Sequence, residues 1–216
     1  MKWEMHAGIL GVGSANKIWG TSSSDLYFVG NDNSSGFIAH YDGNMWVKSK
    51  ITWPVQDIYG SVNKITGQTE ILAVASTVFN VPSGKNVIKI EGNKATIVAD
   101  DGLPVSLKSI WFCSNKAYYI VGDGLYKCKN IGDTWQNIPY TPTKYTEAIR
   151  GQGLNDIVIA GDYRIIFHFN GLTWQNYTMQ VPLSNGSFNA VAIKNNLIIA
   201  VGDNGGSQGV ITMGRR

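Results

Sequence analysis

The chain has 216 residues, of which 44% are hydrophobic and 11% aromatic, which is enough apolar surface for one sizeable core and too much for a disordered chain. Only 15% of the residues are charged, against about 25% in typical globular proteins, while 25 are glycine, a balance that favours many short turns over long helices. The formal charge of +3 comes from scattered lysines and arginines, and no apolar run reaches the length of a membrane helix. We therefore expect no nucleic-acid partner and no membrane insertion.

One phrase recurs along the chain. It first appears as KIWGTSSSDLYFVGN at 17–31, where two apolar bursts flank a polar turn. Related phrases follow about every forty residues, with one longer interval, and each of the first four is followed by a second apolar burst that contains its own turn. The later copies lie at 57–76, 109–123, 148–162 and 190–203. A unit of this length with four short apolar bursts has the size of one propeller blade.

The first unit shows how a blade would be built. Its bursts predict antiparallel strands over 16–20, 25–30, 36–42 and 45–51. The second strand of the units is nearly continuous in apolar residues, which is typical of a strand buried on both faces between stacked sheets. The sequence thus predicts an all-β, single-domain, five-bladed β-propeller with four-stranded antiparallel blades. The blades are expected at 16–52, 56–99, 107–141, 147–180 and 188–216.

The two ends of the sequence complement each other. The fifth unit lacks a fourth strand, whereas the chain opens with KWEMHAG, whose Trp3 precedes the first unit much as Trp46, Trp135 and Trp174 precede later ones. Residues 1–8 are therefore expected to complete the fifth blade, which would close the ring and protect an edge strand. We expect a monomer.

These repeats carry a family resemblance. The pattern IWG, DLYFVG and IAHYDG resembles the bacterial propellers known as sialidase-like or photosystem-assembly-factor-like repeat proteins, across essentially the whole chain. The stretch NIGDTW at 130–135 is similar to an Asp-box, with Asn130 in place of the first aspartate. The Asp-box is a folding motif of β-hairpins, so the resemblance implies an architecture and carries no active site. Members of such families are mostly of unassigned function.

Catalytic motifs are sparse. A sialidase would need an arginine cluster, which the chain lacks. Five-bladed glycosidases use two or three carboxylates across a central pocket, and Glu147 and Asp57 stand at the start of inner strands from which they could reach the axis. Because no supporting motif accompanies them, we expect no catalytic residue and keep a glycosidase as an alternative.

We also expect no cofactor and no metal. Cys113 and Cys128 fall on strands separated by a third strand, roughly 10 Å apart, and have no metal-ligand spacing. His40 and His168 occupy the same repeat position in different blades, which indicates a structural role for each.

Three aspartates follow the second strand of their units: Asp123, Asp162 and Asp203. The repeat places them at the same end of every blade, as a ring. Each could accept backbone hydrogen bonds within its own turn, which is the role that repetition favours. A ring of carboxylates that faces a ligand or a cation is the alternative.

The connections between blades are the least repetitive parts of the chain, and they share a face with the turns that follow the second strands. They place Trp53, Tyr140, Tyr145 and Phe188 beside polar groups, a mixture that stacks sugar rings or anchors a protein partner. Arg150 stands where other copies carry an aromatic residue, and it could pair with Glu147 or face an anionic ligand near the axis.

The sequence therefore predicts a non-catalytic module that binds a glycan through this loop face, with a protein-binding or assembly scaffold as the alternative. The candidate ligand contacts are Trp53, Tyr140, Tyr145, Glu147, Arg150, Asp162, Phe188 and Asp203. The compartment stays open, and a secreted or cell-surface protein whose signal peptide lies outside these residues is one option.

Overall fold

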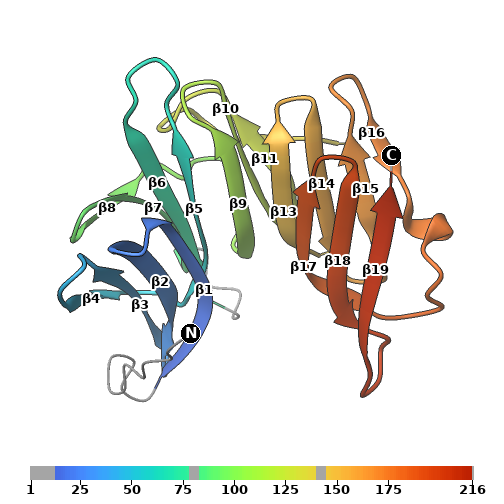
Figure 1. Ribbon diagram of the computed structural model, residues 1–216, viewed down its shortest axis with the longest axis horizontal. Helices are drawn as coiled ribbons and strands as arrows, with labels where there is room; N and C mark the ends of the chain where they lie inside the picture. The colour runs from blue at the N-terminus through green and yellow to red at the C-terminus, as the bar shows by residue number, and fades with distance from the viewer. Residues whose placement is uncertain (1–12, 78–82, 140–144, 216) are drawn as a thin grey trace.

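The computed structural model describes residues 13–77, 83–139 and 145–215. These residues form five antiparallel sheets and no α-helix, so the predicted all-β class and the five repeated units are confirmed (Figure 1). Within the described ranges, no helix is long and apolar enough to cross a membrane. Four sheets have four strands and the fifth has three.

Each sheet is built from strands that are consecutive in the chain. The first is β1 (Gly13–Ser22), β2 (Asp25–Asp32), β3 (Ser35–Tyr41) and β4 (Trp46–Ile51); the second is β5 (Val55–Val62), β6 (Thr69–Ser76), β7 (Lys85–Glu91) and β8 (Lys94–Val98). The third is β9 (Leu107–Cys113), β10 (Ala117–Gly122), β11 (Gly124–Cys128) and β12 (Gln136–Asn137); the fourth is β13 (Thr146–Gly153), β14 (Asp156–Gly161), β15 (Ile166–Phe169) and β16 (Trp174–Asn176). A 3₁₀ turn, η1 (Thr178–Gln180), leads to the fifth sheet, β17 (Ser187–Lys194), β18 (Leu197–Asp203) and β19 (Gly209–Arg215).

The first strand of each sheet lies on the inside of the assembly. These inner strands pack on one another in chain order, β1 on β5, β5 on β9, β9 on β13 and β13 on β17. The sheets therefore follow one another as an arc, from β1–β4 to β17–β19 (Figure 1). This arrangement brings the start of every inner strand to a shared central space.

The core lies between consecutive sheets. The second strands of the three middle sheets are buried on both faces, as predicted: all six residues of β10 are buried, and so are the last six of β6 and the last five of β14. β2 is less completely buried, and β18 is partly exposed. Large aromatic side chains of one inner strand pack on a glycine of the next. A methyl group added to Gly151 would lie 2.6 Å from the ring of Trp111, and one added to Gly60 would lie 2.1 Å from the ring of Trp19. Glycine at these positions lets neighbouring sheets approach closely enough to exclude water.

Repeated turns and histidine–aspartate contacts reinforce individual blades. The Asp42 carboxylate accepts hydrogen bonds from the backbone amides of Asn44 and Met45, both at 2.9 Å. The Asn170 side chain does the same for its turn in the fourth sheet. His40 and His168 each contact the aspartate that begins the second strand of their own sheet, at 2.8 Å in both cases. Their equivalent contacts fit the structural role expected from their repeat position.

The two end sheets do not pack on each other in the way that neighbours do. Within the described residues, β1 and β17 lack the extensive contact that joins each other pair of successive inner strands. The fourth strand expected for the fifth sheet falls on residues 1–8, outside the described part of the chain. Closure of the ring by that strand, and the monomeric state, therefore stay predictions.

Candidate functional site

Every inner strand carries a β-bulge at the same place. At this point the pairing with the second strand skips one residue, and a bulge of this kind bends the strand and re-aims the side chain of the extra residue. We call the five skipped residues the bulge residues: Asn16, Gln56, Lys108, Glu147 and Asn189. All five line one cavity of about 120 Å³ between the inner strands.

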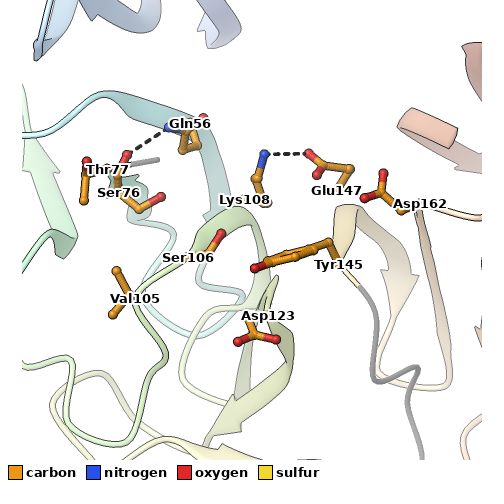
Figure 2. Close-up of a pocket in the computed structure, with 10 residues that line it drawn as sticks. All are labelled: Gln56, Ser76, Thr77, Val105, Ser106, Lys108, Asp123, Tyr145, Glu147 and Asp162. Carbon is orange, nitrogen blue, oxygen red and sulfur yellow. Dashed lines mark hydrogen bonds and ion pairs between the residues drawn. The ribbon is translucent and has the colours of Figure 1, made fainter. Parts of the chain in front are cut away.

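A larger cavity adjoins this inner one. It measures about 510 Å³ and shares Gln56, Lys108 and Glu147 with it (Figure 2). The remaining lining comes from the ends of the second strands and from the connections between blades: Ser76, Thr77, Val105, Ser106, Asp123, Tyr145 and Asp162. We call the two cavities together the funnel. Its outer part opens on the face where the sequence places the ligand site.

The two cavities meet at the residues that they share, Gln56, Lys108 and Glu147, which we call the neck of the funnel. The charged side chains at the neck are paired with each other, whereas, among the described residues, those of the rest of the outer cavity are not. Lys108 Nζ lies 3.1 Å from Glu147 Oε2, an ion pair that joins β9 to β13 (Figure 2). The backbone amide of Asp123 donates to the Ser106 carbonyl at 3.2 Å, and that of Asp162 donates to the Tyr145 carbonyl at 3.1 Å. These bonds fix the aspartates at the wall, and the described residues donate no hydrogen bond to either carboxylate. Tyr145, a residue that is 49% exposed, lines the same cavity.

Asp203 behaves differently from its two repeat equivalents. Its Oδ1 accepts a hydrogen bond from the amide of Gly205 at 2.8 Å, so this carboxylate caps its own turn. Neither Asp123 nor Asp162 makes such a bond among the described residues. The turn role expected for the whole ring of aspartates thus fits Asp203 alone.

This difference gives a stability prediction. Asp203→Ala should lower the free energy of unfolding by about 1 kcal/mol, because it removes one hydrogen bond from the turn. Asp123→Ala and Asp162→Ala should change it by less than about 0.5 kcal/mol, as substitutions that break no internal bond usually do. Denaturant unfolding of the three variants measures this, and equal losses in all three would contradict the distinction.

A buried ionic network lies beneath the neck and ties three inner strands together. Arg150 of β13 binds Asp57 of β5 through two hydrogen bonds of 2.9 Å, one to each carboxylate oxygen. The Ser109 hydroxyl, on β9, donates to the same carboxylate at 2.5 Å, and the Ile110 amide donates to it at 3.1 Å. Asp57 is only 3% exposed. Its carboxylate is therefore held by hydrogen bonds on both oxygens.

The network also sets the protonation of the groups around it. Burial opposes the charge of Arg150, but the neighbouring Asp57 carboxylate outweighs this and raises the pKa of the guanidinium. Burial lowers the pKa of Lys17, and the positive charge of Arg150 lowers it further. The inner cavity is thus lined by Arg150 and Asp57, whose charges cancel, and by Lys17, whose positive charge is disfavoured.

The structure brings four of the sequence-predicted site residues together. Tyr145, Glu147 and Asp162 line the outer cavity, and Arg150 lines the inner cavity with Glu147. The sequence leaves open a pairing of Arg150 with Glu147. In the structure Arg150 instead pairs with Asp57, and Glu147 pairs with Lys108.

The other predicted contacts lie elsewhere. Phe188 is in β17 rather than in a connecting loop, and it is fully buried against the fourth sheet, so it leaves the candidate set. Trp53 is half-buried against the core of the second sheet, and its indole donates to the Ser83 carbonyl at 3.1 Å. Asp203 caps its own turn, as described above, and Tyr140 lies outside the described residues.

Sequence reasoning missed most of the bulge residues. Gln56, Lys108 and Asn189 read as ordinary polar positions at the start of a strand. A signal was nevertheless present, because each bulge residue stands two positions before the apolar residue that anchors its repeat, for example Gln56 before Ile58. Such a column of polar residues next to a core position is what a shared bulge produces.

Comparisons with known proteins confirm the fold class. No family model and no curated protein matches the chain. Among solved structures, that of YCF48 bound to D1 peptide matches with a TM-score of 0.59 and 10% identity, over 88% of this chain and 61% of that one. An ancestral GH74 enzyme matches with a TM-score of 0.63 and 12% identity, over 92% of this chain and 32% of that one. The chain thus spans less than two thirds of either neighbour.

At these identities the likeness concerns the fold alone. Both neighbours are propellers, so the described sheets are blades of a β-propeller. The resemblance to photosystem-assembly-factor-like propellers is confirmed at this level.

Proposed function

We propose that the protein is a non-catalytic binding module and that its ligand enters the outer part of the funnel. The observation that carries the proposal is the exposed ring of Tyr145 next to Asp123 and Asp162, whose carboxylates have no partner among the described residues. A cavity of about 510 Å³ suits a small ligand or a short segment of a larger one. Aromatic rings with free hydrogen-bond acceptors beside them are suited to sugar rings, so the ligand class we propose first is a glycan.

A segment of a protein partner is the second candidate, and one feature favours it. Lys108 is neutralised by Glu147, whereas the two aspartates of the wall are not paired within the described chain, so the described residues that line the outer cavity carry a net negative charge. A peptide with a lysine or arginine would complement that charge. One of the structural neighbours, YCF48, was solved with a bound peptide, which supports a role of this kind on this fold.

Two contacts support the absence of catalysis. A general acid or base must exchange protons with its substrate, yet the Asp57 carboxylate is buried and bound on both oxygens. Glu147 is paired with Lys108. A hydrolysis assay on a panel of aryl glycosides tests this directly, and turnover that disappears in Glu147→Gln would replace the binding proposal with a glycosidase.

Tyr145→Ala tests the binding proposal itself. Because Tyr145 is exposed and supplies the main aromatic surface of the cavity, we expect ligand affinity to fall by about 2 kcal/mol, as for an anchor residue, with the melting temperature nearly unchanged. Calorimetric titration of the best binder from a glycan array and a basic-peptide array measures the loss. Leu172→Ala, which removes an exposed side chain from a turn outside the funnel, is the control. Full affinity in the tyrosine variant would place the site elsewhere.

A further inference from the structure

One core position of the repeat is exposed in the first sheet only. Ile18 of β1 corresponds to Ile58, Ile110, Ile149 and Val191 in the other inner strands. Ile18 is 62% exposed, whereas its four equivalents are at most 7% exposed. The residue type is apolar in every copy, so the sequence provides for burial at this position in the first sheet as well.

A second core position is exposed in the last sheet only. Val201 of β18 is 39% exposed, and its cross-strand partner Ile211 of β19 is 72% exposed. The equivalent pairs in the other sheets follow from the strand registers: Val29 with Ile38, Val74 with Val87, Val121 with Leu125, and Ala160 with Ile166. No member of those pairs is more than 7% exposed. Met213, farther along β19, is 65% exposed.

These exposed positions are the two halves of one repeated interface. Between the first and second sheets, Val29 and Ile38 belong to the same core cluster as Ile58. The same combination recurs between each following pair of sheets, up to Ala160 and Ile166 with Val191. The leading face of a sheet, at the Ile18 position, thus packs on the trailing face of the sheet before it, at the Val201 and Ile211 positions. Among the residues that the structure describes, this interface occurs four times, and one leading and one trailing face have no such neighbour. We call these two the bare faces.

We propose that the bare leading face of one copy of this chain packs on the bare trailing face of a second copy. The occupant follows from the molecule itself, because what covers these faces at every other sheet is another sheet of the same repeat. This proposal replaces the closed monomer that the sequence predicts, because closure within one chain would require β1 to pack on β17, which the described residues do not do extensively. The contact between copies is head-to-tail, so it gives a ring where the rotation closes and a longer chain of copies where it does not.

Contact between the bare leading face and the bare trailing face should also be favourable in free energy. Burial of large aliphatic side chains that are otherwise exposed to water favours association. Exposed apolar patches made of repeated core positions are characteristic of interaction sites.

The test is the mass of the protein in solution, measured by light scattering across a concentration series. We expect a species of at least twice the mass of one chain that dissociates on dilution. Ile18→Lys and Ile211→Lys should each give the mass of a single chain, because each blocks one half of the contact. The new lysine should not lower the melting temperature of either variant by being buried, since both positions are exposed in a single copy.

Mixing the two variants gives the sharpest result. Ile18→Lys keeps its trailing face and Ile211→Lys keeps its leading face, so the mixture should form a dimer and stop there. Ile65→Lys, at a residue that is 88% exposed in the turn between β5 and β6, is the control and should associate like the unchanged chain.

Two results would overturn the proposal. The first is a single-chain mass for the unchanged protein at every concentration; if Ile18→Lys then unfolds far more easily, the ring closes within one chain. The second is association that persists in both variants, which would place the contact on another surface. Failure of ligand binding at Tyr145 would leave this proposal standing, because the two surfaces share no residue.

Discussion

Asp57→Ala should lower the free energy of unfolding by about 3–5 kcal/mol, the loss typical of removing one partner from a buried ion pair. Arg150 is held by two hydrogen bonds to this carboxylate, and its side chain is only 15% exposed. Without Asp57, its charge would stay in the interior with no counter-ion. Since the pair joins strands that are 93 residues apart in the chain, we expect the second, third and fourth sheets to weaken together.

Denaturant unfolding of Asp57→Ala, Arg150→Ala and the double variant measures this coupling. The double variant should lose much less than the sum of the two single losses, because it leaves no unpaired charge. Lys108→Ala, which breaks the more exposed pair with Glu147, should cost less than about 1 kcal/mol and is the matched control. A loss of that small size for Asp57→Ala would show that water reaches the network and screens it.

Trp111→Ala is the second substitution with a large expected effect, a loss of about 3–5 kcal/mol in the free energy of unfolding. Trp111 is 1% exposed and fills the space between the third and fourth sheets, where its ring rests on Gly151. The neighbouring backbones cannot collapse into the vacated space without disturbing both inner strands.

Trp19 provides the comparison, because it occupies the same repeat position in the first sheet and is only half-buried. Trp19→Ala should therefore cost clearly less, and thermal or denaturant unfolding of the two variants ranks them. Equal losses would mean that the ring of Trp19 is as enclosed against the second sheet as the ring of Trp111 is against the fourth.

The repeated apolar pattern was sufficient to predict the strands. The second strands carry long apolar runs because both of their faces are covered, so their residue types report their burial directly, as in β10. The inner strands carry less obvious information, since a bulge shifts the alternation of side chains by one residue. For that reason the sequence predicts that Lys108 belongs to a strand but does not predict that its side chain points into the funnel.

Two site predictions depended on where a strand begins. The sequence predicts Phe188 in a connecting loop, but β17 starts at Ser187, so Phe188 already points into the core. Tyr145 immediately precedes β13 and keeps its exposed position. The pairing of Arg150 with Asp57 could not be found from spacing, because the contact arises from the stacking of the inner strands.

The bulges separate the residues that line the axis from the residues that hold the blades together. Because each bulge residue is skipped by the strand pairing, it contributes a side chain to the axis without taking a place in the interlocked core. Substitutions at Asn16, Gln56 and Asn189 can therefore change the chemistry of the axis while the same blades persist. A scaffold of this kind can vary the side chains that line its axis one position at a time on a common framework.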